Sequence, residues 1–219
     1  MWEKLLAALQ KFFPHNEDAV PYHAPVGPVE PPKPIVPARR VAVIVGHEAK
    51  KEGMTLYTKE GEYSWNKRIA GKLIKAYKGP NEIKLFFRDK VGIEGVAVAV
   101  AAWKADTTIE LHINASGIET ARGCEVLAID GHAVSVNLAA AIAEKLSKDM
   151  SIKKRHGDGV KHLVTNDRGR VALQLCLTKG VRRAVLIEPF FGDFKNDESK
   201  VFVENEDMYV ECLCGLVDI

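Results

Sequence analysis

Three short apolar runs in the chain share one design, because each ends at a side chain that can bind a metal ion or move a proton. They are VAVIVGHE at residues 41–48, TTIELHINAS at residues 107–116 and RRAVLIEP at residues 182–189. Runs of this length, rich in Val, Ile and Leu, predict buried strands. Binding sites in an open α/β sheet form beyond the carboxyl ends of the strands, so we expect His47, His112 and Glu188 to converge there.

The run at residues 107–116 also alternates with a period of two. Ile109, Leu111 and Ile113 fall on one face of the expected strand, and Glu110, His112 and Asn114 fall on the other. A single buried histidine is usually a core residue with a hydrogen-bond partner. The similar runs that end in His47 and Glu188 favour a functional role for His112 instead.

Between these runs, apolar residues at helical spacing alternate with further short strands. We predict strands at residues 82–89 and 123–130, and helices at residues 62–77, 91–105, 133–149, 170–179 and 197–216. The run VAVAV within 91–105 alternates like a strand, but a helix is needed there as a crossover. This order predicts one three-layer α/β domain, with a twisted, mostly parallel or mixed sheet and helices on both faces.

Two other stretches carry less periodicity. Glycines and polar residues between 157 and 169 predict an irregular loop, whose histidines His156 and His162 are either exposed or in contact with a substrate. Residues 2–13 have the spacing of a short amphipathic helix, and residues 14–38 hold eight of the ten prolines. We therefore predict an N-terminal helix and Pro-rich linker at 1–38, followed by a catalytic domain at 39–219.

Composition narrows the class of protein. A length of 219 residues suits one core, and a formal charge of +2 gives no reason to expect a nucleic-acid partner. No run reaches the roughly 18 apolar residues of a membrane span, and the first apolar stretch is interrupted at Gln10 and Lys11, unlike a signal peptide. We expect synthesis in the cytoplasm, four free cysteines and no particular oligomeric state.

The candidate residues form a recognisable chemical set. Two histidines and a carboxylate with an open fourth position make a catalytic zinc site, and His47, His112 and Glu62 supply that set. Taken alone, Glu62 is explained by the helix dipole, since it lies in the first turn of the helix predicted at 62–77. Glu188 can take a proton from zinc-activated water and pass it to a leaving amine.

Four stretches, in order, resemble the zinc-dependent N-acetylmuramoyl-L-alanine amidases that cut peptidoglycan. VAVIVGHE and IELHINAS are similar to the two histidine motifs of that family, EYSWNKRIAGKL to its Glu-x-x-x-Asn helix start and VLIEPFFGDFKND to its catalytic glutamate motif. The resemblance covers residues 40–217 and implies that His47, Glu62 and His112 bind Zn²⁺ and that Glu188 is the catalytic acid/base. The loop HEAKKEGM departs from the family's usual glycine-rich form.

The resemblance implies hydrolysis of the amide between N-acetylmuramic acid and L-alanine of the stem peptide, with peptidoglycan as partner. Alternatives are a zinc carboxypeptidase or deacylase acting on a soluble substrate, and a cell-wall-binding module without turnover. Some relatives carry a helix that blocks the zinc site, and the short chain between Asn114 and Glu188 predicts its absence. Expected synthesis without a signal peptide then favours a phage or prophage endolysin, which acts on the wall after release.

Overall fold

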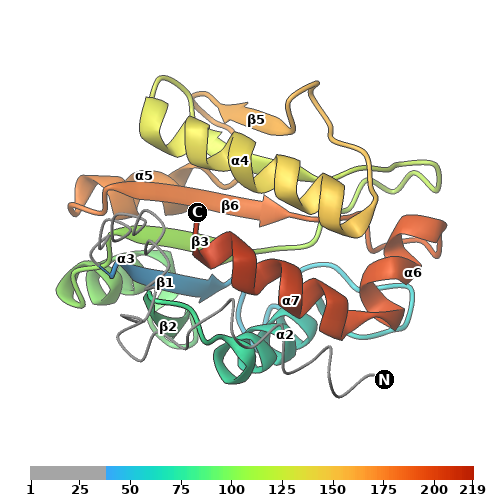
Figure 1. Cartoon of the computed structure of the whole chain (residues 1–219), viewed down its shortest axis with the longest axis horizontal. Coiled ribbons are helices and arrows are strands. Elements are labelled where there is room, and N and C mark those ends of the chain that lie inside the picture. The colour runs from blue at the N-terminus through green and yellow to red at the C-terminus, as the bar shows by residue number, and fades with distance from the viewer. Residues whose placement is uncertain (1–37) are drawn as a thin grey trace, which may run out of the picture. The chain divides into compact units, whose positions relative to one another are not determined.

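The computed structural model describes residues 38–219, which form one α/β unit around a six-stranded sheet (Figure 1). The strands run in the order β2-β1-β3-β6-β4-β5. Their bounds are β1 (Arg40–Val45), β2 (Glu82–Phe87), β3 (Thr107–Leu111), β4 (Glu125–Ile129), β5 (Val160–Leu163) and β6 (Arg183–Glu188). The helix predicted at residues 2–13 and nearly all of the predicted linker lie outside the described residues.

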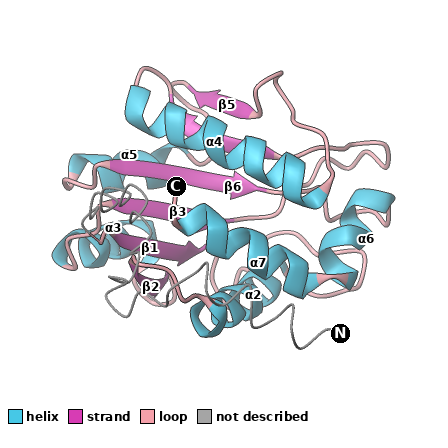
Figure 2. Ribbon diagram, viewed as in Figure 1, coloured by secondary structure: helices cyan, strands magenta, loops and turns pink. Residues whose placement is uncertain are grey.

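Helices cover both faces of this sheet, which confirms the predicted three-layer class (Figure 2). One face carries α2 (Glu62–Ala76), α4 (Ala133–Met150) and α7 (Glu206–Val217), and α6 (Asp197–Glu204) adds Phe202 to the same core. The other face carries α3 (Gly92–Ala102) and α5 (Arg170–Thr178). The ambiguous stretch at 91–105 is therefore a helix, as predicted.

Successive side chains of the central strands pack alternately into the two hydrophobic cores. In β1, Val41, Val43 and Val45 join the core under α2, α4 and α7, whereas Ala42 and Ile44 join the core under α3 and α5. A strand buried on both faces needs apolar residues at every position, which explains the unbroken run VAVIV. The four cysteines are free thiols, and no helix between residues 38 and 219 is long and apolar enough to span a membrane.

The direction of β4 determines which residue lies beside Glu188. β4 pairs with β6 in antiparallel register, whereas the β1–β3 and β3–β6 pairs are parallel. The start of β4 therefore lies beside the carboxyl end of β6, and Glu125 stands opposite Glu188.

Two sequence predictions were wrong. Residues 160–163, predicted as loop, form β5 at the sheet edge, parallel to β4. The buried residues Val160 and Leu163 are three positions apart, so this short strand shows no alternation with a period of two. The single helix predicted at 197–216 is instead α6 and α7, because Asn205 (φ −127°, ψ 50°) leaves the helical region and its carbonyl accepts the N–H groups of Met208 and Tyr209.

Candidate metal centre and active site

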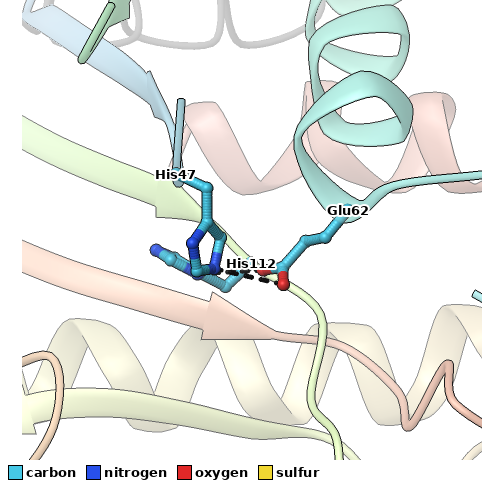
Figure 3. Close-up of side chains that lie close together, drawn as sticks. All are labelled: His47, Glu62 and His112. Atoms are coloured by element: carbon cyan, nitrogen blue, oxygen red, sulfur yellow. Dashed lines mark hydrogen bonds and ion pairs between the residues drawn. The ribbon is translucent and has the colours of Figure 1, made fainter. Parts of the chain in front are cut away.

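Three of the predicted site residues meet just beyond the carboxyl ends of the central strands (Figure 3). His47 lies two residues after β1, His112 directly follows β3, and Glu62 is the first residue of α2. The backbone N–H of Glu62 donates to Met54, which anchors the start of α2 to the loop after β1. The fold thus brings together residues that are 15 to 65 positions apart in the chain.

Their ligand atoms face one another. The Glu62 carboxylate lies 3.1 Å from His47 Nε2 through Oε2 and 3.0 Å from His112 Nδ1 through Oε1. One ligand atom from each of the three residues can be chosen so that all lie within 4.8 Å of one another. Two imidazole nitrogens and one carboxylate oxygen are the donor set of a metal site with an open coordination position.

Glycines leave room for this cluster. A Cβ at Gly53 would lie 2.5 Å from Glu62 Oε2 and 2.6 Å from His47 Nε2, and the φ of Gly53 is +80°. A Cβ at Gly46 would lie 2.4 Å from His112 Nε2. Any side chain at Gly53 or Gly46 would therefore collide with the ligand side chains, and the donor set that these glycines accommodate fits a bound metal ion.

A second layer of contacts fixes the orientation of the ligands. His112 Nε2 lies 3.0 Å from Glu110, and Arg88 forms an ion pair with the same carboxylate. The N–H groups of Ile113 and Met54 donate to the two oxygens of Glu62. Such outer partners set the tautomer and angle of a metal-binding histidine. The sequence placed Glu110 on the His112 face without revealing this contact, which depends on the ring orientation.

The electrostatics of the cluster favour ionised groups. Burial opposes the charge of Glu62, but the hydrogen bonds of His112 and His47 outweigh it and lower the pKa of Glu62 to about 2. Burial likewise opposes the charge of His112, but hydrogen bonds to Glu110 and Glu62 raise its pKa to about 9. His112 would have to lose this proton in order to bind a metal ion.

Glu188 lies on the same cavity, which has a volume of about 540 Å³ and is also lined by His47, Glu62 and His112. Burial, followed by a hydrogen bond with Glu125 and its charge, raises the pKa of Glu188 to about 8. A carboxyl with such a pKa can both accept and donate a proton near neutral pH. All four predicted site residues are thus brought to one cavity, whereas their roles stay predictions.

Further charged residues around the cavity were not predicted as site residues. Glu125 was part of a strand prediction only, and its place beside Glu188 depends on the antiparallel direction of β4. His156 contacts Glu125 at 2.7 Å, whereas His162 pairs with Asp130 at 3.3 Å and does not line the cavity. Lys161 of β5 does line the cavity.

A candidate metal cluster and a protonatable carboxyl on one cavity of an α/β fold define a candidate metallohydrolase. Residues 41–209 match the N-acetylmuramoyl-L-alanine amidase family, and the chain belongs to that family. No curated protein sequence matches the chain.

Solved structures share this fold. An N-acetylmuramoyl-L-alanine amidase from Clostridium difficile 630 superposes with a TM-score of 0.67 and 20% identity, over 83% of this chain and 96% of that one. The catalytic domain of CwlV, an amidase from Bacillus (Paenibacillus) polymyxa var. colistinus, superposes with a TM-score of 0.63 and 17% identity, over 82% of this chain and 96% of that one. The catalytic domain of the CD27L endolysin, which targets Clostridia difficile, superposes with a TM-score of 0.58 and 23% identity, over 82% of this chain and 94% of that one.

Proposed function

We propose that the chain is a zinc-dependent amidase that hydrolyses the bond between the lactyl group of N-acetylmuramic acid and L-alanine in peptidoglycan. The observation that carries the proposal is the meeting of His47, Glu62 and His112 with Glu188 on one cavity in a member of the amidase family. Zinc, when bound, lowers the pKa of a water molecule and polarises the substrate carbonyl.

The chain's own residues supply the remaining steps. His47, Glu62 and His112 would hold the metal ion, and the contact of Glu110 with His112 Nε2 would keep the His112 ring in place. Glu188 accepts a proton from the attacking water and donates it to the alanine nitrogen. A C–O bond forms at the lactyl carbonyl as the C–N bond breaks, so that a carboxylic acid and an amine leave the site.

No helix covers the cavity among the described residues, which supports an enzyme that needs no activating partner. The helix α4 packs against β4, β6 and α7, and none of its residues lines the cavity. Within the described residues, the segment from Asn114 to Glu188 contains only β4, α4, β5 and α5 before β6 itself. We therefore propose that the purified chain is active without a second protein.

We also propose an endolysin-type role, in which the chain acts on the cell wall. The shared fold with the catalytic domain of the CD27L endolysin supports this role. The chain should lower the turbidity of cells whose walls have been exposed by permeabilising the outer layers. Hydrolysis of purified peptidoglycan without any lysis of such cells would contradict the lytic role and leave the amidase intact.

The amidase itself is tested on purified peptidoglycan with and without a chelator. We expect new L-alanine amino termini without new reducing sugar ends, loss of this product with the chelator, and recovery when zinc is added back. Reducing ends would indicate cleavage of the glycan instead. Unchanged release of alanine termini in a verified metal-free protein would contradict zinc dependence.

A further inference from the structure

Glu125 is a buried carboxylate that the proposed reaction does not use. Its side chain is only 3% exposed, and it occupies the first position of β4. The antiparallel register places it opposite Glu188, the last residue of β6. Glu125 is buried and Glu188 is partly buried, so ionisation of both adjacent carboxyl groups would be costly, which favours one proton shared between them.

The surroundings of Glu125 decide which carboxyl is ionised. Asn114 Nδ2 donates to Oε1 at 2.8 Å, and Arg155 Nε donates to Oε2 at 2.7 Å. His156 Nε2 lies 2.7 Å from Oε2, and Lys161 Nζ lies 3.8 Å from Oε1. Every one of these partners favours the carboxylate form.

These partners are themselves held in place. Arg155 and His156 belong to the loop before β5, whose edge pairing with β4 was not predicted from the sequence. The Arg155 guanidinium also stacks over the Phe191 ring, 4.8 Å from its centroid. Arg155 in this loop and Lys161 in β5 thus place two positive charges beside Glu125.

Glu188 has no comparable set of partners among the described residues. The charged groups that act on it are Glu125 from β4, His112 from the end of β3 and Lys161 from β5. Of these, the adjacent carboxylate opposes ionisation of Glu188.

From this geometry we propose that Glu125 is a positioning residue, which holds the Glu188 carboxyl and keeps the shared proton on it. Arg155 and His156 act through Glu125 by keeping it ionised. The inference rests on the proposed function, in which Glu188 moves the proton of the reaction. The pKa values agree with this division, since the pKa of Glu125 is lowered and that of Glu188 is raised.

The test is the titration of Glu188 in Glu125→Gln, which keeps the size of the side chain and removes its charge. The full chain is labelled with ¹³C at glutamate carboxyl groups, its metal content is matched among variants, and the Glu188 signal is assigned by its loss in Glu188→Gln. We expect the midpoint of Glu188 to fall by more than one pH unit in Glu125→Gln. The matched control is Glu144→Gln on α4, an exposed glutamate bonded to Lys154, which should leave the midpoint unchanged.

An unchanged midpoint in folded Glu125→Gln would overturn the inference. If that variant does not fold, titration of the wild type tests the inference instead. The midpoint of Glu188 must then lie well above the ordinary value of 4.5, and the midpoint of Glu125 must lie below it. Midpoints near the ordinary value for both glutamates would overturn the inference.

A kinetic measurement on a soluble muramoyl peptide gives a second readout. The fall of kcat/KM on the acidic side of its pH profile should move to lower pH in Glu125→Gln. Absence of amidase activity would contradict the proposed function alone, since the carboxyl titration does not depend on turnover.

Discussion

At the scale of single residues, the site depends on how closely the backbone approaches the ligands. Gly53 is the clearest case, because its missing side chain leaves space for both Glu62 and His47. Its φ of +80° also lies in the left-handed region, so any other residue there adds strain and a steric clash. These two effects can be separated by experiment.

We predict that Gly53→Ala abolishes tight metal binding, because the new Cβ would overlap Glu62 Oε2 and His47 Nε2. The control is Gly117→Ala, which has a similar φ of +69° but no atom within 4 Å of its Cβ. Both variants should lose about 1 kcal/mol or more of stability from strain, measured by denaturant unfolding. Zinc titration against a chromophoric chelator should show loss of binding only in Gly53→Ala. Equal zinc affinities of the two variants would contradict the proposal that Gly53 leaves space for the metal ligands.

Glu188→Gln separates an enzyme from a wall-binding module. We expect it to bind zinc as the wild type does, because Glu188 is not among the three clustered ligands. Loss of the group that moves the proton should reduce turnover by about 10² to 10⁴-fold or more. Alanine release and metal content measured on the same samples check both points, and substantial residual turnover would remove Glu188 from its proposed role.

The sequence indicated that four candidate residues would lie near one another because each stands at the end of a predicted element, and their roles stay predictions. His47, His112 and Glu188 end apolar strands, and Glu62 opens a helix with a clear apolar stripe. Glu125 and Glu110 could not be assigned in this way. Their contacts depend on the direction of β4 and on the orientation of the His112 ring, which are set by tertiary packing.

Among the secondary-structure elements, α6 begins with a capping box that its sequence encodes locally. The side chain of Asn196 accepts the N–H of Ser199, and the Ser199 hydroxyl accepts the N–H of Asn196, which forms a capping box at the start of α6. This cap orients Phe202, which stacks on Phe190 just after β6. The end of the strand that carries Glu188 is thereby linked to the core under α7.

We predict that Asn196→Ala lowers the free energy of unfolding by about 1 kcal/mol, because the capping bonds are lost. Asn137→Ala is the control, since Asn137 is an exposed residue in the interior of α4 where alanine favours the helix. Urea unfolding of the two variants and the wild type measures the difference. Equal destabilisation by both substitutions would show that the capping box contributes nothing specific.

Sequence patterns predict the elements of this fold unevenly, for physical reasons. Long, periodic elements such as α2 and α4 were predicted within a residue of their observed ends. The edge strand β5 was missed because its pairing with β4 is a non-local contact. The division of α6 from α7 was missed because one asparagine, although it favours caps and turns, does not interrupt the helical spacing of the apolar residues on either side.

At the scale of the whole molecule, the described residues contain both cores and the complete candidate site. We therefore expect a chain that lacks residues 1–38 to hydrolyse a soluble muramoyl peptide at the wild-type rate. We propose that the predicted N-terminal helix and linker bind the cell wall, so binding of the truncated chain to whole cell walls should weaken. Sedimentation of the truncated and full chains with insoluble walls checks this, and identical binding would contradict a targeting role.

Incorporation of ¹⁸O from water identifies the bond that the chain cleaves. A soluble muramoyl peptide is incubated with the zinc-loaded chain in H₂¹⁸O, and both products are analysed by mass spectrometry. We predict one ¹⁸O atom in the lactyl carboxylate of the muramic acid product and none in a peptide whose new amino terminus is L-alanine. Label in a peptide carboxylate, with the muramoyl amide intact, would contradict the proposed amidase and indicate a carboxypeptidase.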